Sequence, residues 1–382
     1  MDFDLTDDQR LLREGVERLL AKEYGFERRR ALVSSPEGWR RTVWKQLAEL
    51  GLLALPFPEA EGGLGGGPVE LMLVMESFGR YLVVEPFLAS IVLAGGCLRH
   101  GASAAQRAAW LPAVMAGGRV LALAHGERGA RYELARVATR ARRSGGGWML
   151  DGAKAFVAGG DAADQFVVSA RTSGEEADSD GISLFLVDAD APGVSRRSYL
   201  TQDRSRAADI ELRSVRLSGD RLLGAEGTAL EVISRVADEA IAALCAEAVG
   251  SMERVHEITV DYLKQRKQFG VAIGSFQALQ HRAVDMLVHI EQARSMTYYA
   301  TMMLASEDAS IRARALSAAK VQIGRSGKFV GEQAVQLHGG IGVTEECQAG
   351  HYYRRLTMIE LTFGDTTHHL AALAAAGGVP DL

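Results

Sequence analysis

The order in which hydrophobic periodicity changes along the chain is the feature that most limits its fold. Residues 1–118 show the three-to-four-residue spacing of amphipathic helices, and residues 229–382 return to it. Between them, residues 119–228 carry short apolar runs with β-branched residues and glycine turns, a pattern typical of strands. Because strands and helices come in blocks and do not alternate, a doubly wound α/β fold is excluded.

We therefore predict an α+β multidomain protein with three domains at these boundaries. The first is an N-terminal helical domain, in which Thr6 and Gln9 form a capping box ahead of an apolar helical face. The second is a middle domain, a small antiparallel β-barrel. The third is a C-terminal four-helix bundle, because four long helical patterns follow one another with short links. These patterns cover residues 229–267, 276–307, 311–338 and 351–376.

The bulk composition excludes several classes of function. The formal net charge is -5 with acids and bases interspersed, so no nucleic-acid-binding surface is expected. No apolar run is long enough to span a membrane. The cysteines, Cys97, Cys245 and Cys347, are scattered, so neither a disulfide framework nor a metal site is predicted. Unpaired cysteines and an acidic, polar amino terminus favour a cytoplasmic protein.

Two segments carry candidate site chemistry. The first, residues 262–270, reads YLKQRKQFG and places Arg266, Gln268 and Phe269 beside a glycine. A guanidinium beside a tight turn can hold an anion such as a phosphate. The second, residues 336–345, reads QLHGGIGVTE, and its adjacent glycines let the backbone approach a ligand closely. Taken singly, each segment is better explained as a helix end with ordinary capping.

Together, the two segments closely resemble the acyl-CoA dehydrogenase family. The resemblance covers nearly the whole chain, because the helical, β and helical regions match the family in order and size. It implies FAD as the cofactor and an acyl-CoA as the substrate, which loses hydrogen at carbons α and β. In the family, a carboxylate takes the α proton and a hydride passes to the flavin. The resemblance also implies an electron-transfer flavoprotein as the electron acceptor.

By the same resemblance, residues of both segments are expected to contact FAD. In the family, the equivalents of Arg266, Gln268 and Phe269 reach across a subunit interface to the FAD of a neighbour. The block from Gln336 to Gly340 meets the adenosine and pyrophosphate part of that FAD. The expected cofactor contacts are Arg266, Gln268, Phe269, Phe276, Gln277, Gln336, Gly339 and Gly340.

The catalytic base is where the chain departs from the family. The usual glutamate belongs to a Glu-Gly-Thr segment, and Phe363 stands at its position. Some members place the base in the long helix, where this chain has Ala240. Glu247 follows seven residues later on nearly the same helical face, in an apolar stretch, and is the candidate base. A glutamate satisfied within the bundle explains it equally well. Glu239 faces another side of the helix, and Asp365 is better explained as a helix cap.

The half-site for the flavin ring is altered as well. The family threonine of a Thr-Glu-Pro segment corresponds to Gly126, and the threonine of Lys-x-Trp-Ile-Thr corresponds to Ala158, although Phe156 keeps an aromatic surface. Some family members are α2β2 assemblies in which one chain holds the flavin ring and the other clamps its tail. We therefore predict a subunit that works with a homologous large subunit. The alternatives are a homotetramer that uses Glu247 as base and a non-catalytic structural partner.

Overall fold

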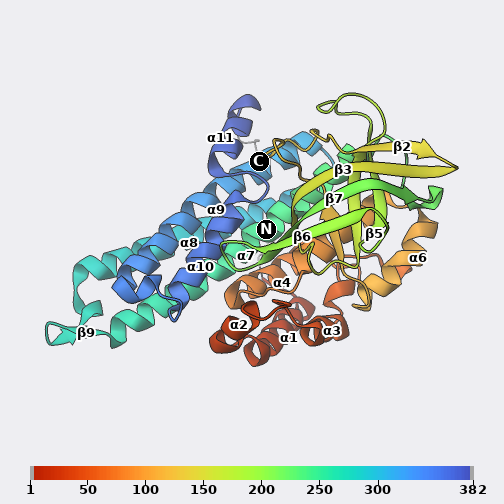
Figure 1. The fold of residues 1–382 in the computed structure, drawn as a ribbon. Helices are drawn as coiled ribbons and strands as arrows, with labels where there is room; N and C mark the ends of the chain where they lie inside the picture. The colour runs from red at the N-terminus through yellow and green to blue at the C-terminus, as the bar shows by residue number, and fades with distance from the viewer. Residues whose placement is uncertain (1–3, 379–382) are drawn as a thin grey trace. The chain divides into compact units, whose positions relative to one another are not determined.

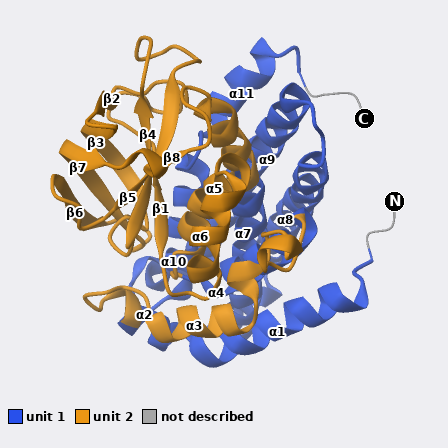
Figure 2. Cartoon of the chain, turned by 90° about the vertical axis from the view of Figure 1, so that its right-hand side faces the viewer, with its two compact units in different colours: residues 1–31, 68–83, 241–382 blue, residues 32–67, 84–240 orange. Residues whose placement is uncertain are grey.

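The computed structural model describes residues 4–378, whose elements are shown in Figure 1. The chain divides into two compact units, drawn in different colours in Figure 2. The first unit comprises residues 1–31, 68–83 and 241–382, and the second comprises residues 32–67 and 84–240. Within the described residues, no helix combines the length and the apolar character needed to cross a membrane.

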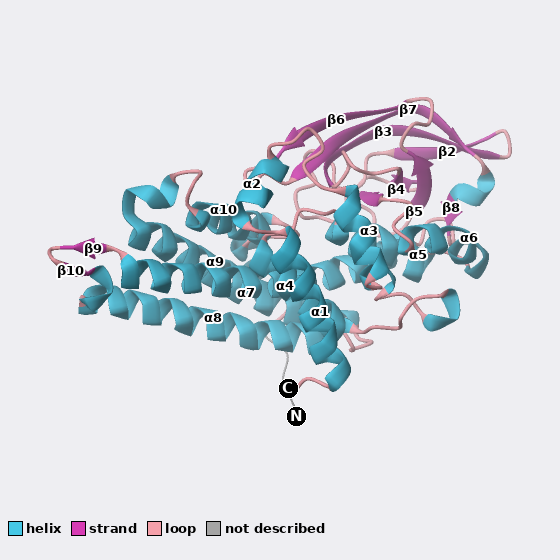
Figure 3. Ribbon diagram, turned by 90° about the horizontal axis from the view of Figure 1, so that it is seen from below, coloured by secondary structure: helices cyan, strands magenta, loops and turns pink. Residues whose placement is uncertain are grey.

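The first unit is helical, and its longest helices lie side by side (Figure 3). The predicted capping box is confirmed, because the Thr6 hydroxyl accepts from the Gln9 backbone N–H while the Gln9 side chain accepts from that of Thr6. Helix α9 packs against α8, α10 and α11, and α1 packs against α4. The helices wholly within this unit are α1 (Asp7–Glu23), α4 (Pro68–Tyr81), α8 (Gln277–Met303), α9 (Ala309–His338), α10 (Gln348–Leu361) and α11 (Thr366–Ala375). Helices α2 (Phe26–Val33) and α7 (Ala229–Gln265) contribute residues to both units.

Helices α4 and α7 cross in backbone contact. A Cβ atom on Gly79 would lie 1.9 Å from the carbonyl oxygen of Glu247. A Cβ atom on Gly250 would lie 1.9 Å from the carbonyl oxygen of Glu76. Any side chain at either glycine would force the helices apart, so the two glycines set the distance at this crossing. The crossing also places Glu247 inside the helix interface.

The C-terminal helix predicted over residues 351–376 is in fact two helices. Helices α10 and α11 are separated by a turn in which Phe363 and Gly364 have φ values of +58° and +115°. The helical pattern was drawn through this break, although Asp365 was expected to cap a helix and does cap α11. The left-handed backbone at Phe363 was not foreseen, because phenylalanine is not a residue that signals it.

The second unit begins with helical segments and a core around Trp44, which is fully buried. One of these segments, η3, is a π-helix, and the Ser90 hydroxyl in it accepts from the backbone N–H of Leu121 at 3.0 Å. This bond ties the helical part of the unit to its first strand. The helical segments are α3 (Arg41–Glu49), η1 (Leu52–Ala54), η2 (Glu59–Glu61), η3 (Leu88–Ala94), α5 (Gly95–Gly101) and α6 (Ala104–Met115).

The rest of the second unit is an eight-stranded sheet with the strand order β6-β7-β3-β2-β4-β5-β8, in which β1 also pairs with β4. Most pairs are antiparallel, as predicted, but β1–β4 and β2–β4 are parallel. Strand β6 escaped the prediction because its residues are largely polar and exposed. The strands are β1 (Leu121–Ala124), β2 (Arg140–Ser144), β3 (Gly147–Ala158), β4 (Gln165–Arg171), β5 (Ile182–Asp188), β6 (Val194–Leu200), β7 (Arg206–Leu217) and β8 (Leu222–Leu223).

Candidate functional site

The first candidate segment is a short hairpin between α7 and α8. Its strands are β9 (Lys267–Gln268) and β10 (Val271–Ala272), and it extends from the ends of the two helices in Figure 3. Phe269 lies in the turn with 91% of its side chain exposed. Arg266 and Gln268 are also exposed, and the Arg266 guanidinium makes no ion pair within residues 4–378. An exposed guanidinium of this kind is available to an external anion.

The second candidate segment is the turn that ends α9. Gly339 has a φ of +65°, which ends the helix, and the turn continues as η6 (Gly339–Val343). A Cβ atom added at Gly339 or Gly340 would meet nothing within 4 Å, whereas one at Gly342 would lie 2.6 Å from the Val335 carbonyl oxygen. The turn is therefore packed on its inner side and open at its first two glycines. Gln336 is exposed beside this opening.

The structure brings the two segments together. Tyr262, in the last turn of α7, stacks on His338, the last residue of α9, with ring centroids 4.5 Å apart. Phe276 is the N-cap residue of α8, and its ring meets that of Phe269 edge to face at 6.2 Å. Gln277 is the first residue of α8 and is exposed. The predicted FAD contacts thus belong to one end of the helical unit.

The chemistry of this surface fits the dinucleotide part of FAD. A phosphate needs charged or backbone N–H donors, and the exposed Arg266 guanidinium and the open backbone of Gly339 and Gly340 supply both. A planar adenine needs an apolar or aromatic surface, and Phe269 is exposed next to the arginine. These residues could hold a diphosphate bearing an aromatic base.

Three phenylalanines with positive φ mark the positions singled out by the family resemblance. The φ values are +53° at Phe156, +53° at Phe269 and +58° at Phe363. Left-handed backbone is a genuine outlier for a bulky residue, and such strain gathers at functional sites. By the family resemblance, the three positions are predicted to match an aromatic near the flavin ring, an aromatic that reaches the cofactor and the base. Positive φ is not confined to them, since Leu82, Arg131, Arg204 and Ser214 also have it. No sequence pattern predicts the left-handed backbone that these three phenylalanines share.

The candidate base Glu247 is held by Arg355. The guanidinium donates from Nε to Oε1 at 2.6 Å and from Nη2 to Oε2 at 2.8 Å, and the Glu247 side chain is 4% exposed. Both carboxylate oxygens are therefore engaged by one fork-shaped donor. Glu247 as the base stays a prediction, but this geometry favours the alternative of a glutamate satisfied within the bundle.

The other nearby carboxylates also have structural partners. Glu239 is bonded to Arg99, lies 2.9 Å from the His100 ring and 3.4 Å from Arg235. Burial pushes the pKa of Glu239 up, but the His100 hydrogen bond and the arginine charges outweigh it and hold that pKa below its ordinary value. Asp365 accepts from the His368 backbone N–H at 2.8 Å, which confirms it as the cap of α11. Ala240, at the alternative base position, is fully buried.

The turn that carries Phe363 is braced by a buried lysine. Lys320, on α9, is 1% exposed, and its ammonium group donates to the carbonyl oxygens of Ile359, Glu360 and Gly364 at 2.8, 2.8 and 2.9 Å. Burial lowers the pKa of Lys320 to about 8. Sequence reasoning missed this brace, for which a lone lysine on an apolar helical face was the available signal. The backbone of the turn is thus fixed independently of the side chain at 363.

The region expected to face the flavin ring contains a buried polar network in the second unit. Lys154 donates to Glu127 at 2.6 Å and to the Ser169 hydroxyl at 3.0 Å, and Ser169 lies 2.9 Å from the His125 ring. Burial, together with the Lys154 charge, lowers the pKa of His125 to about 3, so the ring is neutral. A Cβ atom on Gly126 would lie 3.1 Å from the Ala155 carbonyl oxygen. The network holds the backbone of this region in place. Gly126 and Ala158 themselves carry no hydroxyl that could bind a flavin ring.

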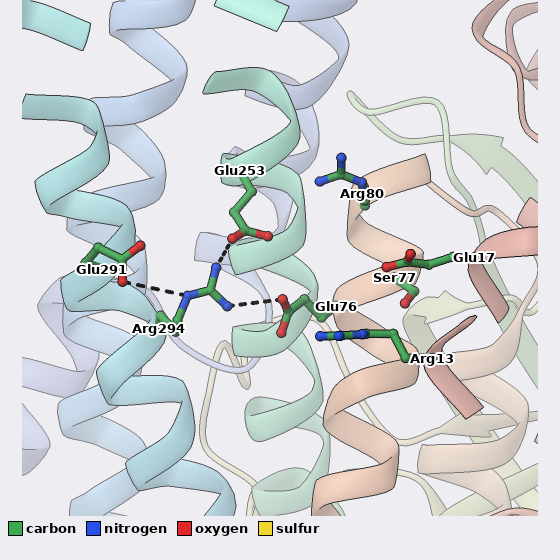
Figure 4. A pocket seen from close by; sticks show the side chains of 8 residues that line it. All are labelled: Arg13, Glu17, Glu76, Ser77, Arg80, Glu253, Glu291 and Arg294. Carbon is green, nitrogen blue, oxygen red and sulfur yellow. Dashed lines mark hydrogen bonds and ion pairs between the residues drawn. The ribbon is translucent and has the colours of Figure 1, made fainter. Parts of the chain in front are cut away.

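A polar cavity of about 320 Å³ lies among helices of the first unit, and several of the residues that line it form ion pairs between helices (Figure 4). Arg294, on α8, is bonded to Glu253, on α7, and lies 3.1 Å from Glu76, on α4, and 3.9 Å from Glu291. One guanidinium therefore joins three helices, and the carboxylates around it face their own partner. The charges of these four residues hold the helices together.

Comparisons with known proteins agree with this architecture. Three family models match in order: the acyl-CoA dehydrogenase N-terminal domain over residues 6–118, the middle domain over 122–215 and the C-terminal domain over 230–378. The acyl-CoA dehydrogenase FadE27 of Mycobacterium tuberculosis is 28% identical and covers 97% of both chains. A chain of a variant of the Tcur3481-Tcur3483 steroid ACAD has a TM-score of 0.86 at 31% identity over 97% of both chains. The ChsE4-ChsE5 complex from Mycobacterium tuberculosis gives 0.87 at 27% identity over 100% of both.

The chain belongs to the acyl-CoA dehydrogenase family. Members are FAD-dependent oxidoreductases that act on CH–CH groups, so the predicted fold class, enzyme class and cofactor are confirmed.

Proposed function

We propose that this chain is the smaller subunit of a heteromeric acyl-CoA dehydrogenase, in which it clamps the dinucleotide tail of an FAD whose ring lies on a homologous large subunit. The observation that carries the proposal is the lack of a carboxylate at both family base positions, Phe363 and Ala240. Of the carboxylates next to these positions, Glu239, Glu247 and Asp365 each have a structural partner.

The residues expected for the FAD tail are present, whereas those expected for the flavin ring are altered, and this difference supports the same assignment. The residues proposed for the tail clamp are all present, and Arg266, Phe269, Gly339 and Gly340 are exposed. The ring half-site has Gly126 and Ala158 where the family has hydroxyls. A chain that clamps a neighbour's cofactor needs the first set and can lose the second.

Apolar residues on α8 support an assembly of chains. Val284, Leu287 and Val288 are 56%, 44% and 50% exposed, and their spacing puts them on one face of the helix. A cluster of this kind is typical of a surface that another chain covers. Two of the similar structures are named for two proteins each, Tcur3481-Tcur3483 and ChsE4-ChsE5, which is the arrangement we propose here.

The proposed reaction is the α,β-dehydrogenation of a CoA thioester to a trans-2-enoyl-CoA. When bound, FAD would supply the hydride acceptor, and the partner would supply the carboxylate that takes the α proton. This chain's Arg266 neutralises phosphate charge, and the backbone of Gly339 and Gly340 approaches the pyrophosphate. Its contribution is binding and orientation rather than proton transfer.

The substrate, acceptor and compartment complete the proposal. The segments HYYRRLTM (residues 351–358) and FGDTTHHL (residues 363–370) resemble the small subunit of pimeloyl-CoA dehydrogenase, so we propose a dicarboxylic or alicyclic acyl-CoA. An electron-transfer flavoprotein is the proposed acceptor. The cysteines of the described chain are free and buried, which supports a reducing, cytoplasmic setting.

The test compares the chain alone with the chain co-purified with a homologous candidate partner. Flavin absorbance and dye reduction with a panel of CoA thioesters are recorded for both. We expect tight flavin and turnover only in the complex. Tight flavin and full activity in the chain alone would instead establish the homotetramer with its own base. A complex that turns over equally well without this chain's flavin contacts would leave it a structural partner.

The Glu247→Gln variant then distinguishes the heteromeric enzyme from the homotetramer that uses Glu247 as base. If the enzyme is heteromeric and its partner supplies the base, a folded Glu247→Gln complex keeps its turnover. If Glu247 is the base, turnover disappears although the complex still assembles and binds flavin. The Glu291→Gln variant, in which an exposed glutamate of α8 is changed, serves as the control.

A further inference from the structure

One aromatic pair joins the hairpin and the glycine turn of the FAD clamp. The rings of Tyr262 and His338 are stacked, with centroids 4.5 Å apart and planes 26° from parallel. The Tyr262 hydroxyl also donates to the His338 carbonyl oxygen at 3.3 Å. The two residues are 76 positions apart in sequence, so the pair connects the ends of two different helices.

Each member of the pair is tied to its own half of the clamp. The Tyr262 carbonyl accepts from the Arg266 backbone N–H, and the Arg266 carbonyl accepts from that of Ile273, both at 2.8 Å. His338 directly precedes Gly339, and its Nδ1 lies 2.8 Å from the Ala334 carbonyl oxygen. An Nδ1–H that donates to this carbonyl fixes the orientation of the imidazole. The pair therefore links two locally ordered segments.

The surroundings of His338 are consistent with this connecting role. The residue is 5% exposed, although Gln336, Gly339 and Gly340 beside it are exposed. Burial lowers the pKa of His338, which favours the neutral form of the ring that Tyr262 contacts. Neutral aromatic rings stack without a cost for burying charge.

We propose that Tyr262 and His338 are positioning residues of the FAD clamp. They set the separation between the Arg266 guanidinium and the backbone of Gly339 and Gly340, so that both reach one dinucleotide. Neither ring has to touch FAD for this purpose. The inference rests on the proposed function and adds to it the residues that make the two halves of the clamp act together.

The experiment uses three variants: Tyr262→Leu, which removes the stacking ring, Tyr262→Phe, which keeps it, and Lys264→Ala, an exposed neighbour, as the control. Hydrogen exchange of the amides of residues 267–272 is measured on the chain alone. The FAD dissociation constant and the unfolding temperature are measured on the flavin-binding complex. Hydrogen exchange tests whether the Tyr262–His338 stack orders the hairpin in the absence of flavin. The FAD dissociation constant tests whether that order contributes to flavin binding.

We expect Tyr262→Leu to speed hairpin exchange and to weaken FAD binding about tenfold, as the loss of an aromatic contact does. Tyr262→Phe should restore affinity to within about threefold, and Lys264→Ala should behave as the wild type. Wild-type affinity in Tyr262→Leu would overturn the inference. So would an affinity loss that Tyr262→Phe does not restore, or one that only follows a fall in unfolding temperature. A wild-type complex without flavin would instead refute the proposed function itself.

Discussion

Arg355 holds Glu247 with two hydrogen bonds, of 2.6 and 2.8 Å, at the level where α7 touches α4. Glu247, which the sequence suggested as the base, is therefore part of the helix interface. The carboxylate has a fixed, charge-matched donor on α10. A base needs a carboxylate that is free to approach a substrate carbon, so the pair supports the proposal that a partner subunit supplies the base.

We predict that breaking this pair destabilises the fold. Glu247→Ala removes the buried carboxylate that accepts two hydrogen bonds from the Arg355 guanidinium, and removing one partner of a buried ion pair costs about 3–5 kcal/mol of unfolding free energy. Urea unfolding of the chain measures it. Asp7→Asn, at an exposed ion pair with Arg10, is the control and should cost less than about 1 kcal/mol. A stable Glu247→Ala variant would contradict the structural assignment.

The helix crossing gives a second prediction. Gly250→Ala should lower the unfolding free energy by about 1–3 kcal/mol, because the added methyl group meets the Glu76 carbonyl oxygen. Gly340→Ala is the matched control, because a Cβ atom there meets nothing within 4 Å. We expect Gly340→Ala to leave stability within about 0.5 kcal/mol of the wild type and to weaken FAD binding in the complex. Equal stability of the two variants would refute the close crossing.

The third prediction concerns pH. His369 lies 3.1 Å from the Phe363 carbonyl oxygen through Nε2 and 3.1 Å from the Ser317 hydroxyl through Nδ1. Burial and the Lys320 charge lower the pKa of His369 to about 4, from an ordinary value of 6.5. Between these two pH values the unfolded chain binds the proton and the folded chain does not. The stability contributed by neutral His369 is therefore complete above pH 6.5 and is lost as the pH falls toward 4.

The measurement for His369 compares unfolding free energies at several pH values. The wild type should lose up to roughly 3 kcal/mol more than His369→Gln on acidification through this window. His281→Gln, at an exposed histidine of α8, should follow the wild type. Parallel pH curves for the wild type and His369→Gln would show that the ring does not titrate as the structure implies.

The hairpin tip gives a fourth prediction, in which stability and binding change in opposite directions. Phe269 is almost fully exposed and has a φ of +53°, which glycine adopts without strain. Phe269→Gly should raise the stability of the chain alone by up to about 1 kcal/mol. It should also weaken FAD binding in the complex at least tenfold, because the aromatic surface is lost. Leu64→Gly, at an exposed apolar residue outside the two candidate segments, serves as the control, and unchanged flavin affinity in Phe269→Gly would remove Phe269 from the site.

Much of the fold could be read from the sequence because periodicity reports which face of each element is buried. The helical, β and helical order and the capping box at Thr6 followed from local patterns. The Asp365 cap of the last helix also followed from them, but the left-handed backbone at Phe363 did not, because the contacts that hold this turn come from Lys320 and His369, which are outside the local pattern. The parallel pairing of β1 with β4 is likewise a long-range relationship.

The candidate site likewise has features that local sequence patterns indicate and features that depend on long-range contacts. Arg266 and the glycine turn could be named as candidates because their two segments together resemble the acyl-CoA dehydrogenase family, and their role in binding FAD stays a prediction. The Tyr262–His338 stack could not, since its members lie on different helices and each is ordinary alone. Glu247 looked available because its sequence neighbours are apolar, whereas its true neighbour, Arg355, lies 108 residues away.

The lysine brace at the Phe363 turn bears on the ancestry of the chain. Lys320 holds only main-chain oxygens, so the frame that would present a carboxylate does not depend on which side chain residue 363 carries. An enzyme can lose its base by a change at one codon and keep the scaffold that once aimed it. A gene duplicate in that state is free to specialise as a companion while the other copy keeps the chemistry. A glutamate introduced at position 363 would meet a backbone that Lys320 already holds in place.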